Sequence, residues 1–379
     1  MGGRSSIARS LTRENDMRAS SRALLLAIFA LGFTQLSSGQ ASAVSFSTKA
    51  LVSDGFVVAN HTDLKLVNPW GIAFNPSGLV WVADNGTDVS TLYDGKGTPS
   101  SLVVSIPKGA PTGIVFNGSK TDFALLHKAS PFIFATEKGV IAAWAPAIDP
   151  NNAQVAFSSK NGAIYKGLAI AGTPGRFLYA ADFHNNRIDV FNASFKPHKL
   201  PGDFSDPKLP AGYAPFNIVN INGVLYVAYA KQGPGAVDEV AGPGNGFVDV
   251  FTANGTLIRR LVTRGKLNAP WGLVVAPAGF GGFGGRLLVG NFGDGAINAY
   301  NLATGAFLGS LKRPDGSPLR IDGLWGLAFG NGVLGQSTRS LFFAAGPADE
   351  QHGVYGRINA IPATTAAGAD AAADAAAGQ

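Results

Sequence analysis

The sequence contains six copies of one short pattern, and this repetition restricts the fold more than any other feature. Each copy is an apolar run with one small residue near its start, as in PWGIAF at residues 69–74. The small residues are Gly71, Gly113, Gly167, Asn217, Gly272 and Gly326, and neighbouring copies are 42 to 55 residues apart. A period of this length fits one four-stranded blade of a β-propeller.

A second and a third apolar run follow inside the repeats. The second run ends in a small residue and then, in most copies, a polar one, at residues 80–84, 132–136, 178–182, 225–229, 287–291 and 341–345. In three copies the third run closes on an aromatic residue, at Tyr93, Phe191 and Tyr300. Short runs rich in Val, Ile, Phe and Tyr, without a long helical period, indicate an all-β fold. We therefore predict a six-bladed β-propeller of four-stranded blades.

The ends of the repeat region predict how the ring closes. The sixth repeat stops near Ile361 without an outer strand, whereas residues 47–53 (STKALVS) precede the first repeat and have strand character. We expect this N-terminal strand to complete the last blade, because closure removes edges that would otherwise pair with other chains. The propeller domain is thus predicted to span residues 44–362.

Residues 1–43 are interpreted as an export signal with an N-terminal extension. Arg18 and Arg22 precede an apolar stretch at 23–33, and Ala41-Ser42-Ala43 forms an A-x-A cleavage site. The stretch is shorter than the roughly 20 residues that span a bilayer, so it matches a cleaved signal. We expect a periplasmic or extracellular protein after cleavage near Ala43, with no transmembrane segment in the mature chain. Residues 363–379, mostly Ala and Gly, are expected to be a disordered tail.

Charge and cysteine content exclude several classes of function. The chain has 30 Lys and Arg against 24 Asp and Glu, and five of the basic residues belong to the export signal. Without a run of Lys or Arg, nothing indicates nucleic-acid binding. The absence of cysteine excludes disulfides, thiolate metal ligands and a Cys nucleophile. We expect a monomer.

The P-x-G-I-A and L-Y-V-A-D patterns, present here in variants such as PWGIAF at 69–74 and LYAAD at 178–182, resemble those of NHL-type six-bladed propellers. The opening NPWGI at 68–72 is also similar to an uncharacterised group of exported bacterial propellers. Gluconolactonase-like and strictosidine-synthase-like proteins are more distant members of this class. The resemblance implies a propeller over residues 45–361. It leaves function open, because propellers host hydrolases, lyases, oxidoreductases and binding modules.

In such a ring, the residue before each small position is expected at one mouth of the central channel. These residues are Trp70, Thr112, Lys166, Phe216, Trp271 and Trp325. The four aromatic ones either pack between blades or form a stacking surface for a sugar or other planar ligand. We treat Trp70, Phe216, Trp271 and Trp325 as candidate ligand-binding residues.

Polar residues concentrate in the turns that follow the second strands of blades 2 and 3. Glu137, His184 and Arg187 lie there, and Glu137 and Arg187 are candidate ligand contacts. A buried Lys166 needs a partner, so we expect a salt bridge to Glu137 or Asp182, or alternatively a bound substrate anion. His184 is either a solvated turn residue or a general base or metal ligand, which makes Lys166 and His184 the catalytic candidates.

Four further side chains could supply oxygen ligands to calcium or zinc at the channel. They are Asp84, Asp182, Asn217 and Asn291. Calcium takes six to eight oxygen ligands, which several blades could provide together. The alternative for Asp84, Asp182 and Asn291 is that each caps the turn after its own strand.

The turn at residues 231–246 (KQGPGAVDEVAGPGNG) in blade 4 is much longer than the corresponding turns of other blades. Long loops in compact folds often serve as lids or binding loops, and the alternative is a passive insertion.

No nucleophile, base and metal set stands out. The sequence therefore favours a module that binds a small molecule, glycan or protein at the channel face. The alternative is a metal-assisted hydrolase or lactonase, with Ca or Zn at the channel mouth.

Overall fold

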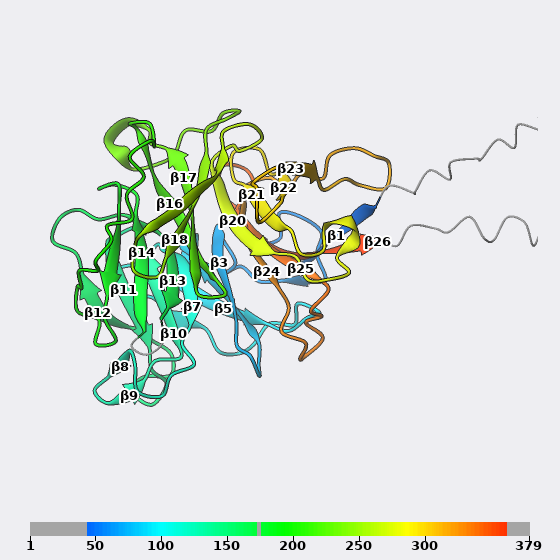
Figure 1. Cartoon of the computed structure of the whole chain (residues 1–379). Helices are drawn as coiled ribbons and strands as arrows, with labels where there is room; N and C mark the ends of the chain where they lie inside the picture. Colours follow the sequence, from blue (N-terminus) through cyan, green and yellow to red (C-terminus); the bar gives the residue numbers. More distant parts are fainter. Residues whose placement is uncertain (1–43, 173–175, 362–379) are drawn as a thin grey trace, which may run out of the picture. The chain divides into compact units, whose positions relative to one another are not determined.

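The computed structural model describes residues 44–172 and 176–361, and most strands of this part build six blades of antiparallel core strands arranged as a β-propeller (Figure 1). The first two blades each have four strands. Blade 1 contains β3 (Pro69–Phe74), β4 (Val80–Asp84), β5 (Val89–Tyr93) and β6 (Val104–Ser105). Blade 2 contains β7 (Pro111–Phe116), β10 (Phe132–Thr136), β11 (Val140–Trp144) and β12 (Gln154–Ser158), and a small hairpin of β8 (Ala124–Leu125) and β9 (Lys128–Ala129) lies between its first two strands.

The remaining blades follow the same order from the inner strand outward. Blade 3 contains β13 (Tyr165–Ala171), β14 (Phe177–Asp182) and β15 (Arg187–Phe191). Blade 4 contains β16 (Tyr213–Ile221), β17 (Val224–Lys231), β18 (Phe247–Thr252) and β19 (Leu257–Thr263). Blade 5 contains β20 (Pro270–Val275), β21 (Leu287–Asn291), β22 (Ile297–Tyr300) and β23 (Phe307–Ser310). These assignments confirm the predicted all-β, six-bladed fold.

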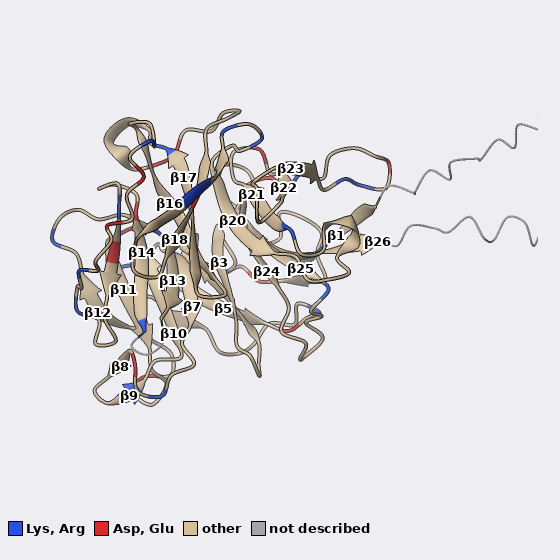
Figure 2. Ribbon diagram, in the orientation of Figure 1, with Lys and Arg blue, Asp and Glu red and all other residues tan. Residues whose placement is uncertain are grey.

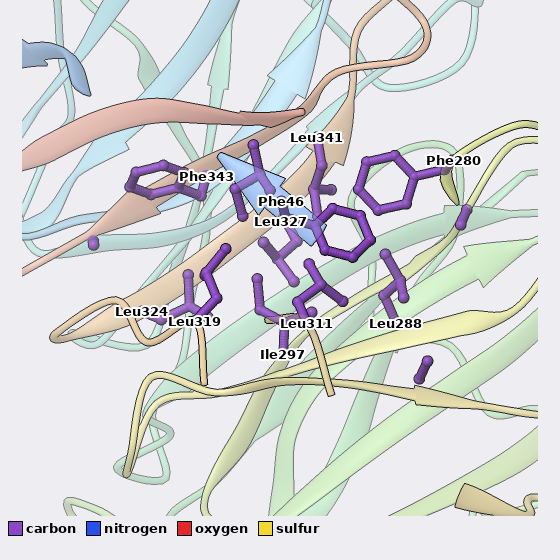
Figure 3. Close-up of a cluster of buried hydrophobic side chains, with 14 of the residues drawn as sticks. Phe46, Phe280, Leu288, Ile297, Leu311, Leu319, Leu324, Leu327, Leu341 and Phe343 are labelled. Atoms are coloured by element: carbon purple, nitrogen blue, oxygen red, sulfur yellow. The ribbon is translucent and has the colours of Figure 1, made fainter. Parts of the chain in front are cut away.

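The ring closes through a strand from the N-terminal side, as the repeat pattern predicted. Blade 6 contains β24 (Leu324–Phe329), β25 (Leu341–Ala345), β26 (Val354–Ile361) and β1 (Ser45–Ser53), with the short β2 (His61–Thr62) beside β1. β1 runs antiparallel to β26, from the pair Ser45 and Ile361 to the pair Ser53 and Val354. Phe46 of β1 is fully buried beside Phe280 and Leu341 in the core between blades 5 and 6 (Figure 3).

The repeated glycines lie where neighbouring inner strands come closest. A Cβ atom at Gly113 would lie 2.4 Å from the backbone nitrogen of Leu168, and one at Gly326 would lie 2.4 Å from the carbonyl oxygen of Trp70. Both distances are below van der Waals contact, so only glycine fits without displacing the neighbouring blade. The close packing of the inner strands around the channel thus explains why glycine recurs in the repeat pattern.

The inner strands also share an irregularity just beside these glycines. Their pairing with the second strand shifts register there, between Tyr165 and Gly167 in β13 and between Pro270 and Gly272 in β20. A β-bulge of this kind re-aims the side chain of the extra residue. The bulged residues are those predicted for the channel mouth, including Lys166 and Trp271.

Blade 3 departs from the four-strand prediction. Its sheet consists of β13, β14 and β15 only, and the chain that should form a fourth strand turns toward blade 4. There Gly202 donates to the carbonyl of Asn254 and Phe204 donates to that of Gly255, at 2.8 and 3.0 Å. The segment contains Pro197, Pro201, Pro207 and Pro210. Proline cannot donate a ladder hydrogen bond, which disfavours continued pairing with β15.

The predicted export signal and the predicted C-terminal tail lie outside the described residues. Within residues 44–172 and 176–361, no helix has the length and apolar character needed to cross a membrane.

Candidate functional site

Aromatic side chains close the channel just below its mouth. Trp70, Phe216, Trp271 and Trp325 are at most 4% exposed and pack together with Phe183 and Phe292. Trp70 and Trp325 are stacked with ring centroids 3.5 Å apart, and Trp271 meets each of them edge-on at 6.0 and 5.8 Å. The rings face one another, so none offers an open surface to a sugar. The arrangement corresponds to the packing interpretation of these residues.

The channel on the other side of this aromatic plug is narrow. Its cavity measures about 70 Å³ and is lined by the inner strands, including Gly71, Gly113, Gly272 and Gly326. This volume accommodates about two water molecules, each of which takes about 30 Å³ in the liquid. Ligand binding at this end of the propeller must therefore take place above the aromatic plug.

Lys166 lies at the mouth with its side chain only 1% exposed. Its Nζ donates to Glu137 Oε1 at 2.5 Å and to Asp238 Oδ1 at 2.9 Å, and it sits 5.2 Å from the centre of the Trp70 ring. Of the two predicted partners, the structure pairs Lys166 with Glu137 and not with Asp182. Burial alone lowers the pKa of Lys166, but the charges of Glu137 and Glu239 outweigh it and raise that pKa overall.

Two more carboxylates complete a cluster that sequence reasoning missed. Burial raises the pKa of Glu239 to about 7 against the opposing charge of Lys166. Burial, together with the charges of Glu239 and Glu137, raises the pKa of Glu350 to about 7. We call Glu137, Asp238, Glu239 and Glu350 the acidic mouth. Glu137 and Asp238 contact the ammonium group of Lys166 and already outnumber it, and ionisation of Glu239 and Glu350 makes the cluster more negative.

The acidic mouth is built from connections between strands, where most of the charged residues lie (Figure 2). Asp238 and Glu239 belong to the long turn at 231–246, which folds back on itself through a bridge between Gln232 and Glu239. Glu350 follows Ala348 and Asp349 in a turn of the last blade, and all three residues have positive φ, of 65°, 56° and 52° respectively. Such backbone strain is typical of functional sites. Only the length of the 231–246 turn signalled part of this arrangement in the sequence.

The 231–246 turn is tied to neighbouring blades. Gln232 Nε2 donates to the carbonyl of Phe183 at 2.6 Å, and the backbone nitrogen of Gly242 donates to Asn268 Oδ1 at 2.6 Å. His184, the second catalytic candidate, is half-buried beside this turn, with Nδ1 3.3 Å from the carbonyl oxygen of Ala236. His184 therefore contacts the turn that carries Asp238, and no carboxylate pairs with it among the described residues.

Arg187 lies at the start of β15 and is not part of the acidic mouth. Its side chain is 43% exposed, with Nε 2.7 Å from Asp189 Oδ1 and one terminal nitrogen 3.5 Å from Asp182 Oδ2. Its pKa is raised, chiefly by the hydrogen bond to Asp189. The structure thus separates Arg187 from Glu137, with which the sequence had grouped it.

The four candidate metal ligands are placed in different local networks. Asp84 Oδ2 accepts from the backbone nitrogen and hydroxyl of Thr91 at 2.9 and 2.8 Å, and burial raises the pKa of Asp84 well above its usual range. Asp182 Oδ1 accepts from the backbone nitrogen of Asn185 at 3.2 Å, and Asn291 donates to Asp294 Oδ1 at 3.0 Å. Asp182 and Asn291 thus contact the turns after their own strands, as the capping alternative predicted, whereas Asp84 binds the neighbouring strand β5 and makes no side-chain capping bond to its turn.

The fourth candidate, Asn217, donates to the carbonyl of Trp271 at 2.8 Å at the channel wall. No hydrogen bond joins any two of the four candidates in residues 44–172 and 176–361. Across the same ranges, no cluster of three or more His, Asp or Glu side chains has an arrangement suited to a metal ion. The four residues do not fit a shared calcium or zinc site in this structure.

Comparisons with known proteins agree with the fold. The NHL repeat model matches residues 66–87, which lie in the first repeat. Two solved structures share the fold with TM-scores of 0.51 at 12% identity: a streptogramin B lyase, with 84% of this chain and 98% of that chain covered, and a protein of unknown function from Bacteroides thetaiotaomicron VPI-5482, with 84% and 76% covered. At this identity the likeness concerns the fold alone.

Two sequence relatives are much closer, and both are viral. The uncharacterized protein R648 of Acanthamoeba polyphaga mimivirus is 39% identical over 295 residues, which are 73% of this chain and 72% of the relative. The uncharacterized protein L690 of the same virus is 38% identical over 299 residues, which are 73% and 77% of the two chains. These relatives are not the exported bacterial propellers that the opening motif suggested. The chain belongs to the same protein family as these two mimivirus proteins.

Proposed function

We propose that this propeller is a binding module whose acidic mouth receives a basic side chain of a partner protein. The observation that carries the proposal is the excess of four carboxyl groups over the single ammonium group of Lys166. Glu239 and Glu350 have pKa values of about 7, so near neutral pH a nearby cation favours their ionised form and the released protons go to the solvent. Burial is the main cause of the raised pKa of Glu350, and an incoming positive charge offsets the further contribution of repulsion from Glu239 and Glu137.

The exposure of the cluster favours a partner that approaches from outside. The side chain of Asp238 is 72% exposed and that of Glu137 is 23% exposed, whereas Lys166 beneath them is buried. The aromatic plug prevents a ligand from entering deeper. The acidic mouth therefore suits the terminal charged group of a side chain on the partner's surface. The planar guanidinium group of arginine can form two parallel hydrogen bonds to a carboxylate, so it fits best.

Calorimetric titration of the full chain at pH 8 with N-acetyl-arginine amide tests this proposal. We expect weak but specific binding, with a Kd on the order of 1 mM, which corresponds to about 4 kcal/mol. The uncharged analogue N-acetyl-citrulline amide should not bind. Binding should be lost in the double variant Glu239→Gln, Glu350→Gln and retained in Asp203→Asn, which removes an exposed carboxylate outside the acidic mouth. Equal binding of both amides, or none, would show that the acidic mouth does not recognise cations.

We also propose that the protein acts outside the cytoplasm, on the basis of the export signal in its sequence. N-terminal sequencing of the protein recovered from a secreting host tests this, and the expected first residue is Val44. Recovery of an intact N-terminus from the cytoplasm would contradict it.

A further inference from the structure

A cavity lies along the outer edge of blade 3, away from the acidic mouth. It measures about 990 Å³. One wall is strand β15, another is the end of β12 with the loop after it, and the third is the segment at residues 197–204. We call this cavity the blade 3 groove.

The blade 3 groove occupies the place where a fourth strand would complete the blade. After β15 the chain turns back through an isolated bridge between Phe191 and Pro197 and two hydrogen bonds, from the Asn192 nitrogen to the Lys196 carbonyl at 2.9 Å and from the His198 nitrogen to the Val190 carbonyl at 2.8 Å. It then leaves the edge, and Leu200 and Phe204 pack in the core that blades 3 and 4 share. Residues 187–189 of β15 are therefore left without a strand on their outer side.

The exposed edge retains backbone groups that can pair with another strand. Arg187, Ile188 and Asp189 pair with β14 on the inner side only. The carbonyl of Val190 points outward, because it accepts the bond from His198. Alternate residues of a strand direct their backbone groups to the same side, so the N–H and C=O of Ile188 also point outward. Neither group has a backbone partner among the described residues.

The lining of the blade 3 groove combines apolar surface with charged groups: three cations, Lys160, Arg187 and Lys199, against two carboxylates, Asp189 and the exposed Asp203. Phe157, Ile188, Val190 and Leu200 provide apolar walls. Lys160 and Lys199 are exposed at the rim, and neither forms an ion pair within residues 44–172 and 176–361. The carboxylate of Asp189 is already engaged, since it accepts from the Tyr165 hydroxyl at 2.8 Å and pairs with Arg187.

We propose that the blade 3 groove binds an extended peptide segment of a partner protein, which adds a fourth strand antiparallel to β15. The segment carries an acidic residue opposite Lys160 and Lys199 and β-branched apolar residues that alternate with polar ones. Strand addition uses main-chain hydrogen bonds for affinity and alternate side chains for specificity. The free part of the edge, Arg187–Asp189, spans about 10 Å at 3.3 Å per residue, so about three residues of the peptide pair with β15 and its remaining residues lie along the groove. This inference does not depend on the acidic mouth.

Fluorescence anisotropy with a labelled peptide of sequence Thr-Val-Glu-Val-Glu-Val tests the proposal on the full chain. We expect saturable binding with a Kd below about 1 mM, and at least a tenfold weaker affinity for the double variant Lys160→Glu, Lys199→Glu. The variant Lys208→Glu, which changes an exposed lysine outside the groove, should bind as the original chain does. A peptide with lysine in place of both glutamates should bind at least tenfold more weakly.

Hydrogen exchange separates strand addition from simple charge attraction. The amide of Ile188 should exchange more slowly in the presence of saturating peptide, and that of Ile258, an exposed residue of blade 4, should not change. The proposal is overturned if no binding occurs up to 1 mM, if the double variant binds equally well, or if Ile188 gains no protection. It is also overturned if sedimentation of the protein alone shows a dimer whose Ile188 amide is already protected, because a second copy then fills the groove.

Discussion

Lys166 replaces an aromatic or small side chain at one of six equivalent bulged positions, and the residues around it have adapted to its charge. Glu137 and Asp238 bind its ammonium group directly, at 2.5 and 2.9 Å. A buried charge without a partner is costly, so removal of either side of the pair leaves the other unsatisfied. The substitution therefore makes the mouth polar and also makes the mouth sensitive to mutation.

Lys166→Met is expected to lower the free energy of unfolding by about 3 kcal/mol at pH 8, as is typical when one partner of a buried ion pair is removed. The loss should be smaller at pH 5.5, where Glu239 and Glu350 are protonated and repel one another less. Urea unfolding at the two pH values measures both quantities. The exposed Lys199→Met serves as control and should change stability by less than about 0.5 kcal/mol. An equally small effect for Lys166→Met would mean that the pair contributes little.

A second buried carboxyl group gives a pH dependence that can be tested separately. Asp249 is fully buried, and its nearest cation is Arg260, with Nε 3.5 Å from Oδ1. Burial, together with the charge of Asp206, raises the pKa of Asp249 to about 7. The native state therefore holds this proton more tightly than the unfolded chain does. Its contribution to stability is complete below about pH 4, the usual pKa of Asp, and is lost as the pH rises through 7.

Asp249→Asn should reduce the fall in melting temperature between pH 5 and pH 8, because the group that loses its proton in this range is gone. Glu239 and Glu350 have raised pKa values and contribute in the same direction, so part of the fall should persist. Differential scanning calorimetry at both pH values measures the difference. Asp149→Asn is the control and should leave the fall unchanged, because hydrogen bonds from Asn151 and Asn152 lower the pKa of Asp149 and keep it ionised across this range. An undiminished fall in Asp249→Asn would assign the pH dependence to other groups.

At the level of the strand, the glycines beside the bulges determine how closely the blades approach. Gly113→Ala should destabilise the protein by about 1 to 3 kcal/mol, the usual cost of overpacking, since its Cβ would lie 2.4 Å from the Leu168 nitrogen. Gly118→Ala is a matched control, because the nearest atom to its Cβ, in Phe116, lies at 3.4 Å. Chemical denaturation of the two variants compares them. Similar stabilities would mean that the inner strands can shift apart without cost.

The strands could be predicted from the sequence because the same apolar runs recur in each of the six repeats. The second run of blade 1 was predicted at residues 80–84, and β4 has these bounds. The pairing of Lys166 with Glu137 was also predictable, because both belong to copies of the repeat whose positions were known. Asp238, Glu239 and Glu350 were not predictable as a group, since two of them lie in a turn without a counterpart in other blades. The missing fourth strand of blade 3 escaped prediction because the repeat pattern contains no signal for the outermost strand.

For the whole molecule, ring closure through β1 is expected to control stability. Phe46→Ala should cost about 3 to 5 kcal/mol, because it leaves a cavity among Phe280, Leu311 and Leu341 in the core between blades 5 and 6 (Figure 3). Phe56→Ala, at a position where the side chain is 50% exposed, is the control. Thermal unfolding of both variants tests this expectation. If Phe56→Ala lowered the melting temperature and Phe46→Ala did not, ring closure through β1 would not control stability.

The pairing of β1 with β26 also has a consequence for biosynthesis. Ser45 leaves the ribosome among the first residues of the propeller, and its partner Ile361 is among the last. At about 5 to 20 residues per second, the two are separated by roughly 15 to 60 seconds of translation. Throughout this interval the short β2 is the only native strand partner that β1 can reach among the described residues, and most of β1 stays unpaired. A chaperone that holds the emerging N-terminal strand would therefore increase the yield of this protein more than one that acts on the finished chain.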